Sequence, residues 1–347
     1  MVPFLVFFLA AEIGAGNARA VAVAAASPLV QSSLRLIDRQ IDGIQDASVR
    51  HQTADAIRNP KTCVASRAHL TEQSRSALRD KLLAEGFVSA ADPLSGIFPG
   101  LIEDGSACPH LPQPFGTAPG SGTGSHHSYP GGLAVHEAFN SVSAQNFARG
   151  YQRIYGEDLR FHEDVLIAAP LWHDWAKTYV YQWNADGAEF QEITIAGTPA
   201  HHVLGLAEAM ARGLPQEFIY VQACSHVAPS LGNEKRVADW IRAAAILAQV
   251  DVSRYLPAGH LPPLRAENVF HNLSDADFPL SVPAVVEMDR VLKSLAPRFG
   301  FQDSAASDYN WKFRHRVLSH FSAERLFVLY SNGGARAVEK EIAVLFR

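Results

Sequence analysis

The sequence is poor in features that mark several common protein classes. Its 347 residues include three cysteines, too few for a disulfide scaffold. Thirty Lys and Arg against 35 Asp and Glu give a net charge of −5 without a basic block, so the electrostatic pattern of a duplex-DNA binder is absent. The apolar run at residues 1–11 is too short to span a bilayer. No internal repeat is found. We therefore expect a globular protein with no duplex nucleic acid partner and no stable membrane span.

What the sequence does contain is an ordinary globular composition and many histidines. Hydrophobic residues make up 48% of the chain, enough at this length for one large core or two smaller ones. Fifteen histidines are many for 347 residues. Since neutral imidazole is the commonest metal ligand in proteins, the positions of these histidines are the main question.

The N-terminus resembles an export signal. The apolar run is followed by the small-residue pattern Ala18-Arg19-Ala20, although no Lys or Arg precedes it and Glu12 interrupts its end. We expect residues 1–25 to be a signal peptide and the protein to be periplasmic or secreted; the alternative is a buried start and a cytoplasmic protein. An oxidising compartment would allow Cys63 to pair with Cys108 while Cys224 stays free.

Helical periodicity dominates the rest of the chain. Apolar residues recur at helical spacing from Leu34 to Ile44, and residues 87–132 are rich in Pro, Gly and Ser, as in a long connection. A hairpin is expected around residues 184–187. We predict an all-α fold with at most this small hairpin, and with further helices over 71–86, 132–155, 163–178, 198–213, 215–226, 234–255, 282–299 and 311–347.

Two polar residues occupy positions on helix faces that should enter the core. His136 shares the apolar stripe of its helix, and Asp251, if the helix over 234–255 is continuous, shares a face with Leu247 and Ala244. Burying an ionised carboxylate without a partner costs several kcal/mol or more. A metal ion would satisfy both residues.

Further candidate ligands lie between them. His173 and Asp174 are adjacent at the end of an apolar run, His201 and His202 open a helix, and His226 ends another apolar run. A mixed set of imidazoles and carboxylates suits Mn, Fe, Zn, Co or Ni rather than calcium or structural zinc. Six such ligands are sufficient for one or two divalent ions.

The segments His126-His127-Ser128-Tyr129-Pro130-Gly131-Gly132-Leu133-Ala134-Val135-His136 and His173-Asp174-Trp175-Ala176-Lys177 resemble motifs of the HD-domain superfamily, helical metal-dependent phosphohydrolases. The resemblance covers about residues 126–255. It implies that His136, His173, Asp174 and Asp251 are the core ligands, that Asp174 bridges two metals, and that His201 and His226 complete the second site. His202 is the alternative to His201. Val227 stands where the family often has a further histidine.

The resemblance divides the chain and assigns a reaction. It implies a helical region and loop over 26–120, a catalytic core over 121–255 and a helical extension over 256–347. Asp174 would orient a metal-activated water for attack on a phosphoryl group. Lys177, one turn beyond His173, and His127 would bind the phosphate. The expected reaction is hydrolysis of a small phosphomonoester or phosphodiester, most plausibly of a nucleotide.

Two other functions fit the same ligand order. Di-iron oxygenases that resemble myo-inositol oxygenase share the sequence of His, His-Asp, His, His and Asp. Such an enzyme would need iron and an open position for dioxygen. A non-catalytic module that binds metal as a structural element is the other alternative.

Overall fold

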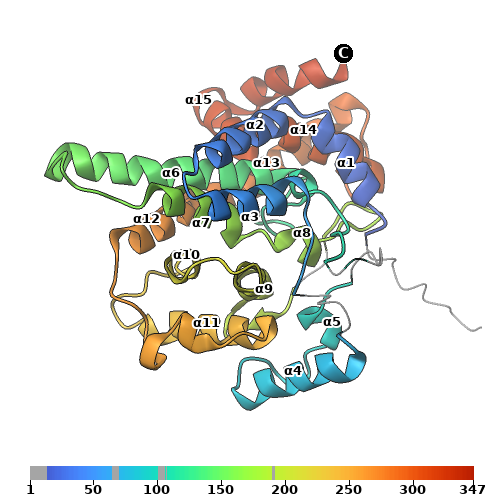
Figure 1. Ribbon diagram of the computed structural model, residues 1–347. Coiled ribbons are helices and arrows are strands. Elements are labelled where there is room, and N and C mark those ends of the chain that lie inside the picture. The colour runs from blue at the N-terminus through green and yellow to red at the C-terminus, as the bar shows by residue number, and fades with distance from the viewer. Residues whose placement is uncertain (1–13, 65–69, 101–105, 107, 190–191) are drawn as a thin grey trace, which may run out of the picture.

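The computed structural model describes residues 14–64, 70–100, 106, 108–189 and 192–347. Over these residues the chain is helical, and its two short strands form one antiparallel hairpin that pairs Thr194 with Pro199 (Figure 1). The all-α prediction is confirmed. The elements are α1 Asn17–Ala25, α2 Pro28–Gly43, α3 Ala47–Arg58, α4 Glu72–Ala84, α5 Leu94–Ile97, α6 Gly132–Tyr155, α7 Glu163–His173, α8 Lys177–Val180, β1 Thr194–Ile195, β2 Thr198–Pro199, α9 Ala200–Ala211, α10 Gln216–Gln222, α11 Glu234–Ala248, α12 Ala266–Asp275, α13 Phe278–Leu295, α14 His315–Phe321 and α15 Ala323–Ile342.

The centre of the molecule is α7. Every residue of this helix after Glu163 is buried, as expected for a helix that is apolar on all sides. It packs against α6, α10, α12 and α3, so that its C-terminal end lies deep in the bundle. Side chains at that end are therefore shielded from bulk water by neighbours from distant parts of the sequence.

Several predicted helices are confirmed, and some boundaries differ. Helix α6 has the predicted bounds, and α2 begins at Pro28 because the Ser27 side chain caps it by accepting a hydrogen bond from the Val30 amide. The turn predicted at residues 184–187 is present between Trp183 and Glu189, which form an isolated bridge, but the two strands lie further along the chain. Helices α1, α3 and α12 were not predicted.

The C-terminal helices α13, α14 and α15 form a second core with their own apolar residues. Arg314 connects this core to the loop before α6: its guanidinium pairs with Asp289 and donates to the Ser128 carbonyl oxygen at 2.8 Å. Arg314 is buried, and a buried charged group needs a partner of opposite charge and hydrogen bonds. The contact fixes the loop that enters α6 against the C-terminal region.

Cys63 and Cys108 form a disulfide, and Cys224 is free and buried; this is the pairing that an oxidising compartment would allow. The apolar run at residues 1–11 lies outside the described residues. Helix α1, which overlaps the expected signal peptide, buries Ala20 and Ala24. Among the described residues no single helix is long and apolar enough to cross a bilayer; only α1 and α2 together pass that test, and they meet at a bend of 83°. Export stays a prediction.

Candidate metal centre

Helices α6 and α7 bring three of the predicted ligands together. His136 lies in the second turn of α6, His173 is the last residue of α7, and Asp174 is its C-cap. The exposed fractions of these side chains are 0%, 0% and 1%. Because α6 and α7 pack along each other, residues 37 positions apart in the sequence meet at the buried end of α7.

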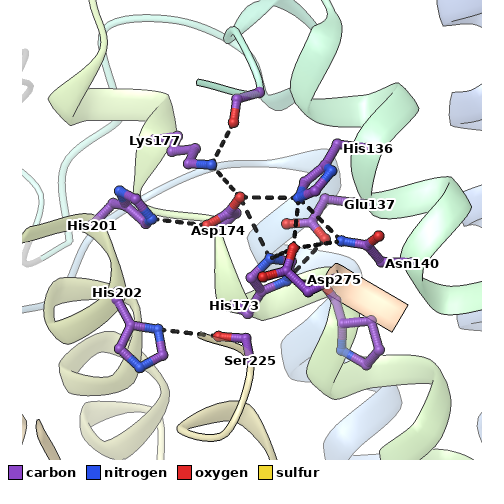
Figure 2. A network of polar contacts seen from close by, with 12 residues as sticks. His136, Glu137, Asn140, His173, Asp174, Lys177, His201, His202, Ser225 and Asp275 are labelled. Carbon is purple, nitrogen blue, oxygen red and sulfur yellow. Dashed lines mark hydrogen bonds and ion pairs between the residues drawn. The ribbon is translucent and has the colours of Figure 1, made fainter. Parts of the chain in front are cut away.

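These residues form the first donor set, completed by Asp275 at the end of α12. Asp275 Oδ1 lies 3.1 Å from His136 Nε2 and 3.2 Å from His173 Nε2. Asp174 Oδ2 lies 3.3 Å from His136 Nε2 and 3.4 Å from His173 Nε2. Two nitrogen and two carboxylate oxygen atoms therefore converge from three helices (Figure 2).

The spacing of these atoms fits a bound transition metal. Ligand atoms at about 2.1 Å from one ion lie roughly 3.0 Å apart in octahedral and roughly 3.4 Å apart in tetrahedral coordination. All four distances in the first donor set are in that interval. Within the described part of the chain His173 Nε2 is buried and its polar neighbours are the carboxylates of Asp174 and Asp275. Both observations are compatible with a bound metal ion.

The other oxygen of Asp174 faces the second donor set, made of His201 on α9 and His226 in the loop after α10. Asp174 Oδ1 is 2.9 Å from His201 Nε2 and 3.9 Å from His226 Nε2. Figure 2 shows Asp174 between His201 on one side and the first donor set on the other. The two oxygens of one carboxylate thus serve two groups of ligands, each compatible with a metal ion.

Hydrogen bonds at the Nδ1 atoms of His173, His201 and His226 aim the Nε2 atoms of these three rings inward. His173 Nδ1 contacts the Pro170 carbonyl oxygen at 2.8 Å, and His226 Nδ1 contacts Thr198 Oγ1 at 3.1 Å. His201 Nδ1 contacts Glu192 Oε1 at 2.7 Å, and the Tyr181 hydroxyl donates to the same carboxylate oxygen. Partners of this kind fix the tautomer and orientation of metal-binding histidines.

The carboxylates of the centre are held in their charged form. Burial alone would raise the pKa of Asp174, but the charges of His173, Lys177 and His201 hold that pKa well below its usual range. Burial lowers the pKa of His136, whereas hydrogen bonds to Asp174 and Asp275 raise it to about 9 overall. Burial lowers the pKa of His226 to about 4. The pKa values of His173 and His201, like that of His136, are raised despite burial by the charges of nearby carboxylates, so without a cation these three rings carry the positive charge. A divalent ion would replace those protons, since metal binding requires neutral imidazole.

The structure corrects one predicted ligand. Asp251 is exposed and caps the turn at residues 252–254, where its carboxylate accepts from the Ser253 amide at 2.9 Å. The prediction was wrong because it extended α11 to residue 255. The helix ends at Ala248, Gln249 adopts a left-handed conformation, and Asp251 therefore lies outside the helix whose face was counted.

Asp275 occupies the position beside His136 and His173 that was expected of Asp251. It lies in α12, beyond the expected end of the core at residue 255, and α12 packs against α6, α7 and α10. A signal for it existed in the sequence. Asn268, His271 and Asp275 are spaced at three and four residues on one helix face, and the first two are buried. That polar face is unusual for a surface helix.

His201 rather than His202 faces Asp174. The His202 ring points the other way: its Nδ1 is 3.3 Å from Ser225 Oγ, and it stacks on His226 with ring centroids 4.3 Å apart. The sequence left open whether His201 or His202 faces Asp174. Since consecutive side chains on a helix point about 100° apart, only one of the two can do so.

The two predicted phosphate ligands lie in different environments. Lys177 is 3% exposed. Its ammonium donates to Asp174 Oδ2 and to the Gly120 carbonyl oxygen. His127 is not among the residues that line the cavity, and its Nδ1 lies 3.2 Å from the Tyr129 hydroxyl; substrate binding by His127 stays a prediction. The tight turn before α6 presents its neighbour His126 to the cavity instead.

A cavity of about 510 Å³ opens onto the second donor set. Its wall combines cationic and hydroxyl groups with aromatic and apolar ones. The described lining residues are Ser121, Ser125, His126, Asp174, Lys177, Tyr181, Gly197, Thr198, Pro199, His201, Ser225, His226, Arg236, Trp240, Asn272, Asp275, Ala276, Phe278 and Val282. A small anionic molecule with an apolar part could reach Asp174 through it.

No family model, curated protein or solved structure matches this chain. The metal-binding character of the centre therefore depends on its own donor atoms, their spacing and their burial. The likeness to HD-domain proteins stays a prediction from the sequence motifs.

Proposed function

We propose that the protein is a metal-dependent phosphohydrolase of the HD-domain type. The observation that carries the proposal is the position of Asp174, whose two carboxylate oxygens face two buried donor sets beside an open cavity. Carboxylates shared in this way are typical of two-metal sites that hydrolyse phosphate esters. The proposed cofactor is one or two ions of Mn, Fe, Zn, Co or Ni per chain.

A divalent ion bound at such a site lowers the pKa of water and neutralises charge on a phosphoryl oxygen. The chain's own residues supply the rest. Asp174 holds its two oxygens toward both donor sets and would orient the attacking water. Lys177 is positioned by the Gly120 carbonyl oxygen and would neutralise a phosphate oxygen at the cavity wall. Both are the catalytic residues of the proposal.

The cavity wall supports a nucleotide-sized phosphate ester as substrate. Arg236 lies 6.0 Å from the Trp240 ring centroid, measured from its guanidinium carbon, and both line the cavity. This pair offers a charge for a phosphate next to an aromatic surface for a base. Tyr181, on the same wall, adds a second aromatic group. His126 takes the place at the cavity that the sequence assigned to His127.

The proposal is tested with purified protein, Mn²⁺ or Zn²⁺, and a panel of phosphomonoesters and phosphodiesters. We expect metal-dependent phosphate release from the parent, its loss on chelation, and its return when metal is restored. Asp174→Ala should abolish turnover while circular dichroism stays helical, because Asp174 contacts both donor sets. Turnover by Asp174→Ala at the parental rate would contradict the assignment.

The same experiment separates the other functions. Fe²⁺-dependent oxygen consumption without phosphate release would favour the oxygenase alternative, since the donor set of four histidines and two aspartates also suits a di-iron centre. Bound metal with neither activity would favour the non-catalytic module. Either result would overturn the phosphohydrolase proposal.

A further inference from the structure

Beside the first donor set lies another group of possible ligands, and the proposed function assigns no metal ion to it. It consists of His126 and His127, in the turn that precedes α6, and Asp277, in the short link between α12 and α13. One ring nitrogen of each of these histidines, one of His136, and one carboxylate oxygen of Asp277 all lie within 4.8 Å of one another.

The imidazoles of this group have nitrogens without partners. His126 Nδ1, His127 Nε2 and His136 Nδ1 are buried and make no hydrogen bond within the described part of the chain. Most buried polar side-chain atoms in proteins are paired, because an unpaired one loses its hydration without compensation. Three unpaired imidazole nitrogens in one cluster are therefore costly unless they share a common partner, and a metal ion is the partner that neutral imidazole binds best.

The His127 ring is oriented for this role. Its Nδ1 lies 3.2 Å from the Tyr129 hydroxyl, which leaves Nε2 directed toward Asp277 Oδ2 at 3.7 Å. A hydrogen bond at one nitrogen that leaves the other for a ligand is the usual arrangement of metal-binding histidines. The distance between Nε2 and Oδ2 is a few tenths of an ångström above the roughly 3.4 Å expected for tetrahedral coordination.

The turn that carries these histidines is tightly constrained. His127 has a φ of +51°, a left-handed conformation that is uncommon for residues other than glycine. Gly132 allows the turn to close, because a Cβ atom at this position would lie 1.9 Å from the His127 carbonyl oxygen. The backbone therefore places adjacent histidines on the same side of α6, beside His136. Such a strained arrangement is typical of functional segments.

We propose that His126, His127 and Asp277 bind a third divalent transition-metal ion, next to the first donor set and bordered by His136. The donor set of imidazoles with one carboxylate is suited to Zn²⁺ or a similar ion. This ion would fix the turn before α6 to the link between α12 and α13. Because Asp275 and Asp277 lie two residues apart, it would also hold the end of α12 that delivers Asp275 to the first donor set.

The site goes beyond the proposed function, because neither Asp174 nor Lys177 belongs to it and hydrolysis needs only the two donor sets at Asp174. Its ion would be accessible from the cavity through His126, which lines the wall. The His127 side chain also lies 3.7 Å from Glu324 Oε1. Glu324 is outside the cluster and thus provides a matched control: its loss should affect an ion pair of His127 but not the ion.

The experiment measures Zn²⁺ bound per chain by elemental analysis, after loading the purified full-length protein with Zn²⁺ alone and removing loosely bound ions. The parent is expected to retain about three ions, and Asp277→Asn and His127→Gln about two each. Glu324→Gln should retain the parental number. Anomalous scattering from Zn²⁺ in crystals of the parent should place one ion between residues 126, 127 and 277.

A parent that retains no more than two ions, with no anomalous peak at this position, would overturn the proposal and leave the phosphohydrolase assignment intact. An equal loss in Glu324→Gln would also overturn it, since the ion pair rather than the cluster would then be responsible. Failure of Asp174→Ala to affect hydrolysis contradicts only the proposed function. If Asp277→Asn does not fold, His126→Gln and the anomalous map of the parent decide the question.

Discussion

The two sides of the Asp174 carboxylate differ in depth and spacing. On the first side the histidine side chains, His136 and His173, are fully buried, and the distances between donor atoms span only 3.1–3.4 Å. On the second side His201 is 5% and His226 is 22% exposed, and their distances to Asp174 are 2.9 and 3.9 Å. The two histidines of the first donor set lie between packed helices, whereas both histidines of the second line the cavity, which Asp174 and Asp275 also reach.

This difference indicates a division of roles. Ligands that come from α6, α7 and α12 are fixed by the packing of those helices, so the first ion should bind tightly and hold the helices together. His226 lies in the loop after α10 and is more exposed than the other histidines of the centre. The second ion should bind more weakly and be more accessible to substrate. Three variants test whether the two donor sets bind metal independently and with different affinities, as their geometry indicates.

The largest effect is expected for Asp275→Asn. The change removes the carboxylate charge that lies 3.1 Å from His136 and 3.2 Å from His173. We expect affinity for the first ion to fall by more than the roughly 100-fold that follows loss of a ligand's hydrogen-bond partner, with a corresponding loss of hydrolysis. Metal titration and phosphate release measure both quantities.

Asp251→Asn is the matched control, because the sequence alone favours this residue over Asp275. Its side chain is exposed and bonded to Ser253, and asparagine caps a helical turn as well as aspartate does. We expect metal content and activity to be unchanged. If Asp251→Asn lost metal and Asp275→Asn kept it, the arrangement of α11 and α12 described here would be wrong.

An intermediate effect is expected for His226→Gln. The variant should lose the second ion and keep the first. The carboxylate oxygen that His226 faces is Asp174 Oδ1, whereas the first donor set uses Asp174 Oδ2. Affinity for the second ion should fall by roughly 100-fold, a typical cost for weakening a metal site. Isothermal titration with Zn²⁺ would show one remaining binding phase. Loss of both phases would mean that the two sides are not independent.

The smallest effect is expected for Glu192→Gln. Glu192 accepts a hydrogen bond from the His201 amide at 2.8 Å and orients the His201 ring. An amide would preserve the shape but weaken this orientation, lowering affinity for the second ion by roughly 10-fold. Glu189→Gln serves as the control, because Glu189 pairs with Thr123 and contacts no predicted ligand. Equal effects of both changes would exclude a specific role for Glu192.

Most residues of the centre could be predicted from the sequence. His136 stood out because a histidine on an apolar helix stripe needs a partner, and α6 has the predicted bounds. His173, Asp174 and His201 followed from the resemblance, and the structure brings them together with His226. Local periodicity is a good guide for α6 because this helix has 24 residues and one of its faces is buried.

The differences between prediction and structure arose where a helix ends or a turn reverses. Asp251 was assigned from a helix that stops three residues before it, at Ala248. His127 was placed at the cavity, although its left-handed backbone directs the ring toward Tyr129 and Asp277. Hydrophobic periodicity indicates neither the end of α11 nor the left-handed conformation of His127. One residue in such a conformation changes the direction of the chain after it.

The sequence by itself determined the helical class and singled out His136, His173 and Asp174, because helical periodicity and polar residues in apolar runs depend on residue type and spacing within one segment. Only the tertiary structure decided that α12 supplies the remaining carboxylate and that two histidines of the α6 turn meet Asp277. Such choices depend on which distant helices pack together, and that is set by the complementarity of whole surfaces rather than by any local pattern.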